Sequence, residues 1–565
     1  MSHPRPFDDR SDLHHRRSPS GGAQVNTGAS SGGGTSLEEG ASQAGEGIGI
    51  AQAATIVALG NVSSRVLGLV RETVISHLFG ATGVVSAFRV ASIVPTMIYD
   101  LLIGGMISAA LIPVFSDYAE PENRQQLWRL ASTLFTIVAI VFSAIVLALE
   151  LAAPAVAWML GGGFDQLLLA QTTALMRLIM PAVLFLGLAG AMTGLLYSNK
   201  RFVYPAFGAS VFNAGIIITA LLLADRVGIA SLSLGVLLGS ILQLAIQLPA
   251  LRDLRFSFSL DFSHPGLRRL GSLYLPVALG LVVSQVGIAI DRNLASRTGE
   301  QSIAWMQNAT TLVQFPLGLV AVAISTAVLP SLSRLASGAE MMRFRRTLGM
   351  GLRTVLLLIV PATIGLLVLA TPVIALLFEH GAFQPYDTLR TAQALRLYLI
   401  GLPFAGIDQV LIFAFYARKD TKTPVLVGVL GVFIYLAVAL ALIAPLGMLG
   451  LVLANSVQLS SHALVMLYLA HRYFDGLRGQ GLARTVLKVL VASALTGCVV
   501  YLSVPHLASI AGYGSLWGEP LIVAGGAGLG VISYALLVWA LRVEEISQIR
   551  ELVTTRWATR KNNSS

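Results

Sequence analysis

Charged side chains interrupt long apolar stretches early in this sequence. Arg65, Arg71 and Glu72 lie in one such stretch, and Arg89 lies in the next. Neither Arg65 nor Arg89 has an acidic residue three or four positions away, so neither is neutralised along its own helix. An unpaired buried arginine needs an anion, and its planar, permanently charged guanidinium donates two parallel hydrogen bonds to a phosphate. These residues therefore predict a site for a phosphate-bearing ligand.

Further charges lie in other apolar stretches. The Asp291–Arg292 pair, like Arg71 with Glu72, leaves two alternatives open, ion pairing between helices and ligand binding. Asp100 and Asp408 are isolated acids, for which ion coupling and bonding to the backbone at a helix break are the alternatives. Placing a charged side chain at the centre of a bilayer costs roughly 2.5–3.5 kcal/mol of insertion free energy. Each of these charged residues is therefore a functional candidate. We predict substrate binding by Arg65, Arg71, Arg89 and Arg292, and ion coupling or gating by Glu72, Asp100, Asp291 and Asp408.

Motifs for nucleotide or metal chemistry are missing from the sequence. It contains neither a GxxxxGK[ST] phosphate loop nor an HExxH motif. The single cysteine, Cys498, cannot form an internal disulfide, and no Cys/His cluster indicates a metal site. We therefore expect a protein that is not an enzyme and that has no cofactor and no metal.

The composition predicts the elements that carry these residues. Of 565 residues, 55% are hydrophobic and only 12% are charged, and the mean hydropathy is +0.76. A soluble protein has about 25% charged residues, so this class is excluded. About 20 apolar residues cross a bilayer, and fourteen apolar runs predict an all-α polytopic membrane protein with 14 transmembrane helices. The runs are 48–78, 83–115, 126–157, 167–197, 204–224, 227–250, 270–296, 302–333, 348–377, 389–416, 423–444, 446–470, 486–504 and 519–541.

The basic residues are distributed unevenly between alternate connections. If the N-terminus is cytoplasmic, the cytoplasmic connections and the C-terminal tail hold 23 Lys and Arg residues, and the outer connections hold three, Arg226, Arg297 and Arg390. This bias follows the positive-inside rule, so we expect both termini in the cytoplasm. The net charge of +10 is then a signal of topology, and we expect no nucleic-acid partner.

The chain also repeats itself at a nearly constant offset. Arg177 and Arg396 are 219 residues apart, as are Lys200 and Lys419. Six helices per repeat give two lobes of the same orientation, an arrangement suited to alternating access. The predicted division is a disordered cytoplasmic tail (1–46), an N-terminal six-helix lobe (47–256), a C-terminal six-helix lobe (257–478), transmembrane helices 13 and 14 (479–545) and a cytoplasmic tail (546–565). The first of these tails is rich in Gly and Ser and cannot bury enough apolar surface to fold.

Two groups of motifs resemble a known family. One is Ser64-Arg65-Val66-Leu67-Gly68, followed by Arg71-Glu72 and Phe79-Gly80-Ala81. The other is the segment 415–425, Phe-Tyr-Ala-Arg-Lys-Asp-Thr-Lys-Thr-Pro-Val. Both resemble the MurJ/MviN family of lipid II flippases, which belongs to the multidrug/oligosaccharidyl-lipid/polysaccharide exporter superfamily. The resemblance covers residues 48 to about 545.

This resemblance implies a function and partners. The chain would move lipid II, the undecaprenyl-diphosphate-linked peptidoglycan precursor, from the inner to the outer leaflet of a bacterial inner membrane by alternating access. Its partners would be this anionic lipid-linked substrate, membrane lipids and cell-wall synthesis proteins. A groove for the lipid tail beside helices 13 and 14 is also implied.

The functional positions of the family carry over only in part. Tyr99 stands at the position of a family arginine in span 2, and Ser86 at that of an acid. In span 8, Thr311 and Gln314 stand where the family has an arginine and an acid. Arg89 would restore one positive charge. These departures leave alternatives open: a flippase for another polyprenyl-diphosphate-linked oligosaccharide such as a capsule or O-antigen unit, a transport-inactive scaffold for cell-wall synthesis, and, less favoured, a drug/cation antiporter.

Overall fold

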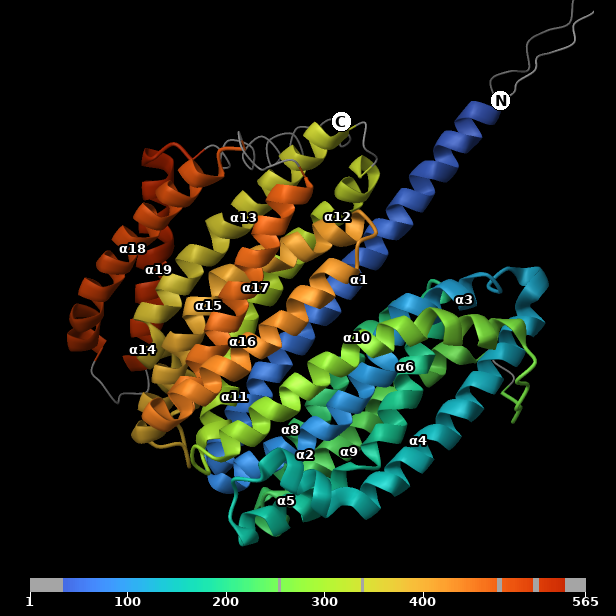
Figure 1. Cartoon of the computed structure of the whole chain (residues 1–565), viewed down its shortest axis with the longest axis horizontal. Coiled ribbons are helices and arrows are strands. Elements are labelled where there is room, and N and C mark those ends of the chain that lie inside the picture. Colours follow the sequence, from blue (N-terminus) through green and yellow to red (C-terminus); the bar gives the residue numbers. More distant parts are fainter. Residues whose placement is uncertain (1–33, 253–255, 337–339, 475–479, 512–517, 544–565) are drawn as a thin grey trace, which may run out of the picture. The chain divides into compact units, whose positions relative to one another are not determined.

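Helices account for nearly all of the described part of the chain, which contains no strand (Figure 1). The structure is a computed structural model and describes residues 34–252, 256–336, 340–474, 480–511 and 518–543. The chain divides into two compact units, residues 1–54 and 55–565. The division falls within the first helix, α1 (Gly34–Phe79). The fold and the site below concern the second unit.

A first helix group follows α1 and packs mainly on itself. Its helices α2, α4, α5, α6, α8 and α9 contact one another. The group consists of α2 (Gly83–Tyr99), the π-helical segments η1 (Asp100–Gly104) and η2 (Ile107–Leu111), α3 (Ile112–Ser116), η3 (Pro121–Asn123), α4 (Arg124–Gly161), α5 (Gln166–Ile179), α6 (Ala182–Ser198), α7 (Val203–Ala206), α8 (Gly208–Val227), α9 (Ala230–Ala245) and η4 (Leu248–Leu251).

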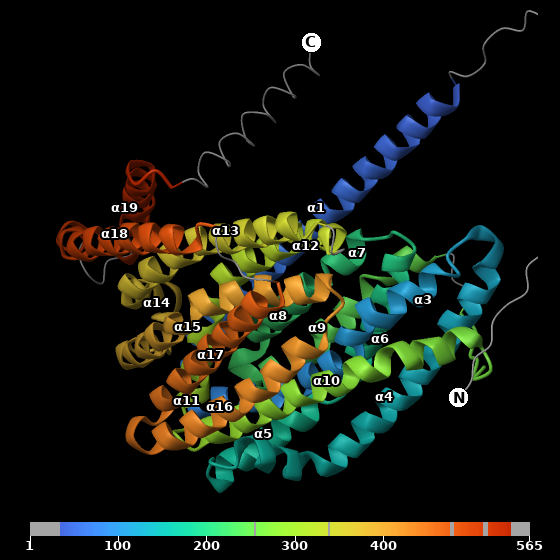
Figure 2. The ribbon, with the colours of Figure 1, turned by 45° about the horizontal axis from the view of Figure 1, so that its top comes forward.

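A second helix group is formed by α11 to α17, and the last two helices pack on it. Helix α18 lies along α13, and α19 contacts α14 and α18 (Figure 2). These elements are α11 (Ser302–Pro316), the π-helical η5 (Leu317–Val322), α12 (Ala323–Leu335), α13 (Met341–Val368), α14 (Ala370–Phe378), α15 (Pro385–Ala417), α16 (Lys422–Leu446), α17 (Met448–Tyr473), α18 (Leu482–Ala511) and α19 (Gly518–Ala540).

Helix α10 (Pro265–Ser296) contacts both groups. Arg269 near its start forms an ion pair with Asp117, which precedes α4. Farther along, Asp291 accepts a hydrogen bond of 2.5 Å from the hydroxyl of Tyr435 on α16. The connection that precedes α10 is also attached to the first group, because the Ser257 amide donates to Ser132 Oγ on α4. Helix α10 is therefore bonded to both groups.

The helical passages agree with the predicted all-α fold of 14 transmembrane helices. Among the described residues, ten helices are long and apolar enough to cross a membrane, or eleven if the bent pair α5 and α6 counts as one span. The other passages are α1, the run from α2 to α3 that contains η1 and η2, and α10. Each of these carries charged residues within an apolar sequence, including Arg65, Asp100 and Arg292.

The backbone repeats at the same offset as the sequence. Lys200 and Lys419, 219 positions apart, both adopt left-handed conformations, with φ of 58° and 61°. Gly228 and Gly447 have the same spacing, and both have φ of 57°. A left-handed non-glycine residue costs roughly 1–2 kcal/mol. It is retained here at the ends of α6 and α15, where the amides of the two lysines bond to helix carbonyls three residues back.

One predicted boundary differs from the structure. Residues 34–46, expected to be disordered, form the first turns of α1. The stretch combines glycines with good helix formers such as Leu37, Glu38 and Ala41, and it continues an apolar helix without a break. Composition alone gave too much weight to Gly and Ser. Residues 1–33 of the predicted tail, and the predicted C-terminal tail 546–565, lie outside the described residues.

Candidate functional site

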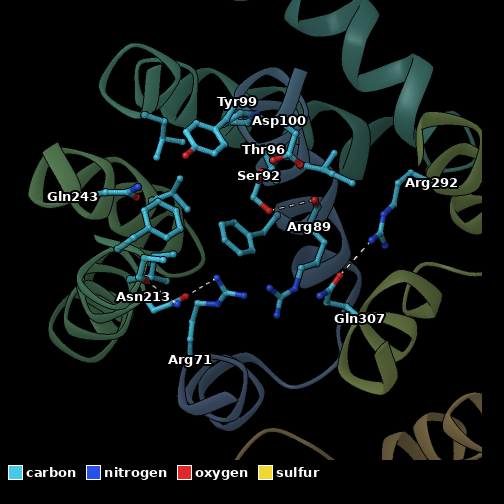
Figure 3. A pocket seen from close by; sticks show the side chains of 18 residues that line it. Arg71, Arg89, Ser92, Thr96, Tyr99, Asp100, Asn213, Gln243, Arg292 and Gln307 are labelled. Carbon is cyan, nitrogen blue, oxygen red and sulfur yellow. Dashed lines mark hydrogen bonds between the residues drawn. The ribbon is translucent and has the colours of Figure 1, made fainter. Parts of the chain in front are cut away.

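A cavity of about 510 Å³ lies beside α2 (Figure 3). Residues of α8 and α9 form its first-group wall, and α1, α10 and α11 contribute from other directions. Its polar lining residues are Arg71, Arg89, Ser92, Thr96, Tyr99, Asp100, Asn213, Gln243, Arg292 and Gln307. Apolar residues such as Phe88, Phe212 and Val236 complete the lining. The cavity thus combines an apolar lining with a few charged groups that converge on it, and this composition is typical of a ligand site.

One face of α2 supplies a row of polar residues to this cavity. Arg89, Ser92, Thr96 and Asp100 are spaced by three, four and four positions, which keeps them on one side of a helix. The hydroxyls of Ser92 and Thr96 donate to backbone carbonyls one turn earlier, Arg89 O and Ser92 O. Asp100 begins the π-helical segment η1, and its side chain is exposed. The row therefore begins with a cation and ends with an anion.

Glu72 holds two arginines of the cavity in position. This carboxylate is fully buried, and Arg71 Nη2 donates to it at 2.6 Å. Arg89, on the neighbouring α2, forms a second ion pair with Glu72. Arg71 also donates from Nη1 to Asn213 Oδ1 on α8, at 2.9 Å. Two cations and one anion leave a net positive charge, and the shared carboxylate orients both guanidinium groups.

The adjacent residues Asp291 and Arg292 have separate surroundings. Arg292 lines the cavity and donates from Nη2 to Gln307 Oε1 on α11, at 3.3 Å. Asp291 is bonded instead to Tyr435 on α16. Successive residues on a helix point about 100° apart, so one residue faces the cavity while its neighbour contacts the second group. A third arginine therefore reaches the cavity from outside the first group.

Four predicted site residues do not line the cavity: Glu72 and Asp291, whose contacts are given above, and Arg65 and Asp408. Arg65 donates from Nη1 to the carbonyl oxygen of Gln314 at 2.9 Å and packs against Gly318 in η5. Asp408, expected to be an isolated acid, is bonded to His462 Nδ1 at 2.8 Å. This expectation was wrong because the histidine comes from α17, 54 residues later in the chain. The sequence around Asp408 therefore does not predict this partner.

Several lining residues were not predicted from the sequence. Ser92 and Thr96 have a signal in hindsight, namely their helical spacing from Arg89. Asn213, Gln243 and Gln307 have none, because they lie on three other helices and nothing in the sequence sets them apart from the further polar residues of those helices. Among the described residues, no group of His, Cys, Asp or Glu could hold a metal ion.

The two helix groups touch at the end of the bundle where α1 passes into α2. The Ala382 amide donates to His77 O at 2.9 Å. Elsewhere at this end, the Ala304 amide of α11 donates to Ser86 Oγ of α2 at 3.3 Å. The end of α10 is bonded to the first group, since Gly163 N donates to Ser296 Oγ at 2.9 Å and Asn293 donates to Met159 O at 2.8 Å. We call this region the closed end. A Cβ atom on Gly163 would overlap the backbone of α10, so the contact requires glycine.

Together, the multi-pass helical fold and the basic cavity between its parts define a membrane transporter. Solved structures agree at the level of fold. A multidrug resistance MATE family transporter of the MOP superfamily in an inward-facing conformation matches with a TM-score of 0.62 at 12% identity, over 74% of this chain and 95% of that one.

Closer similarity identifies the family. The model of the lipid II flippase MurJ family matches residues 75–516, and the chain belongs to this family. The lipid II flippase MurJ of Burkholderia cenocepacia is 30% identical over 430 residues, 74% of this chain and 82% of that protein. A probable lipid II flippase MurJ of Haemophilus influenzae is 31% identical over 471 residues, 79% and 91% of the two chains. A solved lipid II flippase MurJ in an inward closed conformation matches with a TM-score of 0.73 at 25% identity, over 86% of this chain and all of that one. The resemblance noted in the sequence is thereby confirmed.

Proposed function

We propose that this protein is a lipid II flippase. It moves the undecaprenyl-diphosphate-linked peptidoglycan precursor from the inner to the outer leaflet by alternating access and catalyses no covalent step. The observation that carries this proposal is the convergence of Arg71, Arg89 and Arg292 on one cavity of a MurJ family member. The localisation that follows is a bacterial inner membrane, with both termini in the cytoplasm.

The cavity charges match a diphosphate. Arg71, Arg89 and Arg292 carry three positive charges, and Glu72 removes one. At this end of the cavity, which lies apart from Asp100, the remainder balances the two negative charges of a diphosphate diester. Guanidinium groups bind phosphate oxygens through paired hydrogen bonds, which a lysine cannot imitate. We assign substrate binding to these three arginines, and to Glu72 a gating role through the two arginines that it orients.

Arg65, Asp291 and Asp408 keep proposed roles outside the cavity. Arg65 would release Gln314 and take up the substrate in another state of the transport cycle. Asp291 and Asp408 remain candidates for ion coupling, through their bonds to Tyr435 and His462. Movement of an anion toward the positive outer side gains roughly 2.3 kcal/mol per charge per 100 mV, so the membrane potential itself can drive transport.

The arrangement of parts supports alternating access. We assign residues 47–256 and 257–478 to two lobes that rock against each other, with 479–545 as an appended pair of helices. In this assignment the closed end faces the outside, because its connections are poor in Lys and Arg. An apolar groove of about 390 Å³ between α13 and α18 is a candidate site for the prenyl tail. It is lined by Ile364, Val368, Ala494, Gly497, Cys498, Tyr501 and Leu502.

Complementation tests the proposal directly. A bacterium depleted of its own lipid II flippase should grow and keep its shape when it expresses this chain. Arg89→Ala should abolish rescue, because it removes a cavity cation. Arg353→Ala should rescue, because Arg353 lies on α13 away from the cavity. Since Arg89→Ala also leaves Glu72 with one partner fewer, protein level in the membrane must be measured, and Glu72→Gln combined with Arg89→Gln serves as the charge-balanced variant.

The alternatives give different results in the same strain. A flippase for another polyprenyl-diphosphate oligosaccharide, or a transport-inactive scaffold, would not restore growth at a normal protein level. Equal rescue by Arg89→Ala and Arg353→Ala would remove Arg89 from the substrate site.

A further inference from the structure

One wall of the cavity carries a carboxylate that the diphosphate does not need. Asp100 lines the cavity at the far end of the polar row of α2, and Figure 3 shows it on the opposite side of the cavity from Arg71. No hydrogen bond or ion pair of its side chain occurs among the described residues. An anion here repels a phosphate, so its presence calls for a different explanation.

The local backbone leaves this carboxylate accessible. Asp100 starts the π-helical segment η1, and π-helical turns in membrane helices often accompany functional sites. Gly104 lies one turn farther, and a Cβ atom there would stand 3.5 Å from Asp100 Oδ1. Glycine at position 104 therefore keeps space free beside the carboxylate. An unpaired carboxylate within a membrane span is costly, which favours a role in binding a cation.

The cavity consequently has a positive and a negative side chain, Arg89 and Asp100, on one face of α2. Arg89 and Asp100 are eleven positions apart, which corresponds to three full turns and roughly 16 Å along a helix. Ser92 and Thr96 lie between them on the same face. A molecule that extends along α2 with its anionic group at Arg89 therefore brings a group about three turns away to Asp100.

We propose that Asp100 binds an ammonium group of the transported substrate and so selects substrates that carry both a diphosphate and a free amine. This inference rests on the proposed function. One carboxylate provides one or two of the six or more oxygen ligands that a hard cation such as Ca²⁺ prefers, whereas an ammonium is satisfied by few acceptors. A sugar that bears a short peptide is long enough, because an extended peptide spans about 3.5 Å per residue.

Equilibrium binding to the full-length protein in lipid nanodiscs tests this inference. The probes are a polyprenyl-diphosphate muropeptide with one free side-chain amine on its peptide, and the same compound with that amine N-acetylated. Wild-type protein should bind the free amine about fivefold more tightly, the effect of one partly exposed charge-assisted bond. Asp100→Asn should lose this preference by weakening only the free-amine compound. Asp225→Asn, an exposed acid on α8 that does not line the cavity, should behave as wild type.

Each other outcome has a definite meaning. Equal wild-type affinity for the two compounds, or an equal loss for both in Asp100→Asn, would overturn the ammonium site and leave the flippase proposal standing. An Asp100→Asn protein that keeps the preference yet transports neither compound would assign Asp100 to ion coupling, and this also overturns the inference. Failure of the wild type to bind either compound would instead reject the proposed function.

Discussion

At the scale of single residues, the cavity depends on one buried carboxylate. Glu72 is inaccessible to solvent and bonds to both Arg71 and Arg89. A buried ion pair contributes little net stability when complete, but removal of one partner leaves a buried charge uncompensated. Glu72 is therefore the residue on which the position of both arginines rests.

A double-mutant cycle should reveal this dependence. We expect Glu72→Gln and Arg89→Gln each to lower thermal stability by several kcal/mol, since each leaves a charge with too few partners. The double variant should lose less than the sum, with a coupling energy of about 1–3 kcal/mol. Thermal unfolding followed by tryptophan fluorescence in one detergent measures all four proteins.

An exposed pair provides the control for this cycle. Arg343 and Glu340 form a surface ion pair of 3.1 Å with side chains 75% and 40% exposed. Their cycle should give a coupling below about 1 kcal/mol. Additive effects at Glu72 and Arg89 would mean that the two side chains do not share the buried pair described above.

At the scale of elements, the start of α10 depends on a histidine cap. His264 Nδ1 accepts a hydrogen bond from the Gly266 amide at 3.1 Å. Burial lowers the pKa of His264 below its ordinary value of 6.5; Asp261 opposes this shift and Arg129 adds to it. A protonated Nδ1 cannot accept a hydrogen bond, so the cap requires the neutral ring.

The cap should weaken in acid. Because the folded-state pKa is lowered, the unfolded segment binds the proton more strongly, and stability falls as the pH drops below about 6.5. Loss of a helix cap costs about 1 kcal/mol. The protection of the first turn of α10 against hydrogen exchange should therefore fall about fivefold between pH 7 and pH 5. Mass spectrometry measures this protection after correction for the intrinsic exchange rate. A His264→Asn variant, whose cap does not titrate, should show no such step; the same step in both proteins would contradict the cap.

At the scale of the whole transporter, contacts at the closed end hold the two helix groups together. The hydrogen bond from the Ala382 amide to His77 O joins the turn before α15 to the end of α1. Gly80 and Gly381 both have positive φ there, and a Cβ atom on either would overlap the opposite backbone. Such close contact between the two backbones is compatible with a gate at which the end of α1 and the turn before α15 meet in one state and separate in another.

A crosslink across the closed end should stop transport. After Cys498→Ser, the pair His77→Cys and Ala382→Cys lies within reach of a short thiol crosslinker, because the two backbones are hydrogen-bonded. Crosslinking should reduce lipid II transport in vesicles at least tenfold, and a cleavable linker should restore it on reduction. The pair Thr133→Cys and Ser259→Cys, whose native hydroxyls are 3.2 Å apart beside α4, is the control and should leave transport within twofold. Full activity of the first pair after quantitative crosslinking would exclude opening at this end.

Sequence alone determined the number and type of elements. Bilayer thickness sets the length of an apolar run, so the fourteen helical passages and their order follow from local composition. The distribution of Lys and Arg between the connections predicts their direction. The repeat was also visible, because Lys200 and Lys419 are the same residue type 219 positions apart, and the structure gives both the same left-handed backbone conformation. Family membership followed from short motifs for the same reason.

Tertiary structure decided which charges meet. Arg71, Arg89 and Arg292 come from three helices, and only the packing of α1, α2 and α10 brings them to one cavity. The same packing turns Arg65 to the carbonyl of Gln314 and pairs Asp408 with His462. Helical periodicity fixes the face on which a residue lies but not the neighbour that this face meets, since that neighbour is often a hundred or more residues away in the chain.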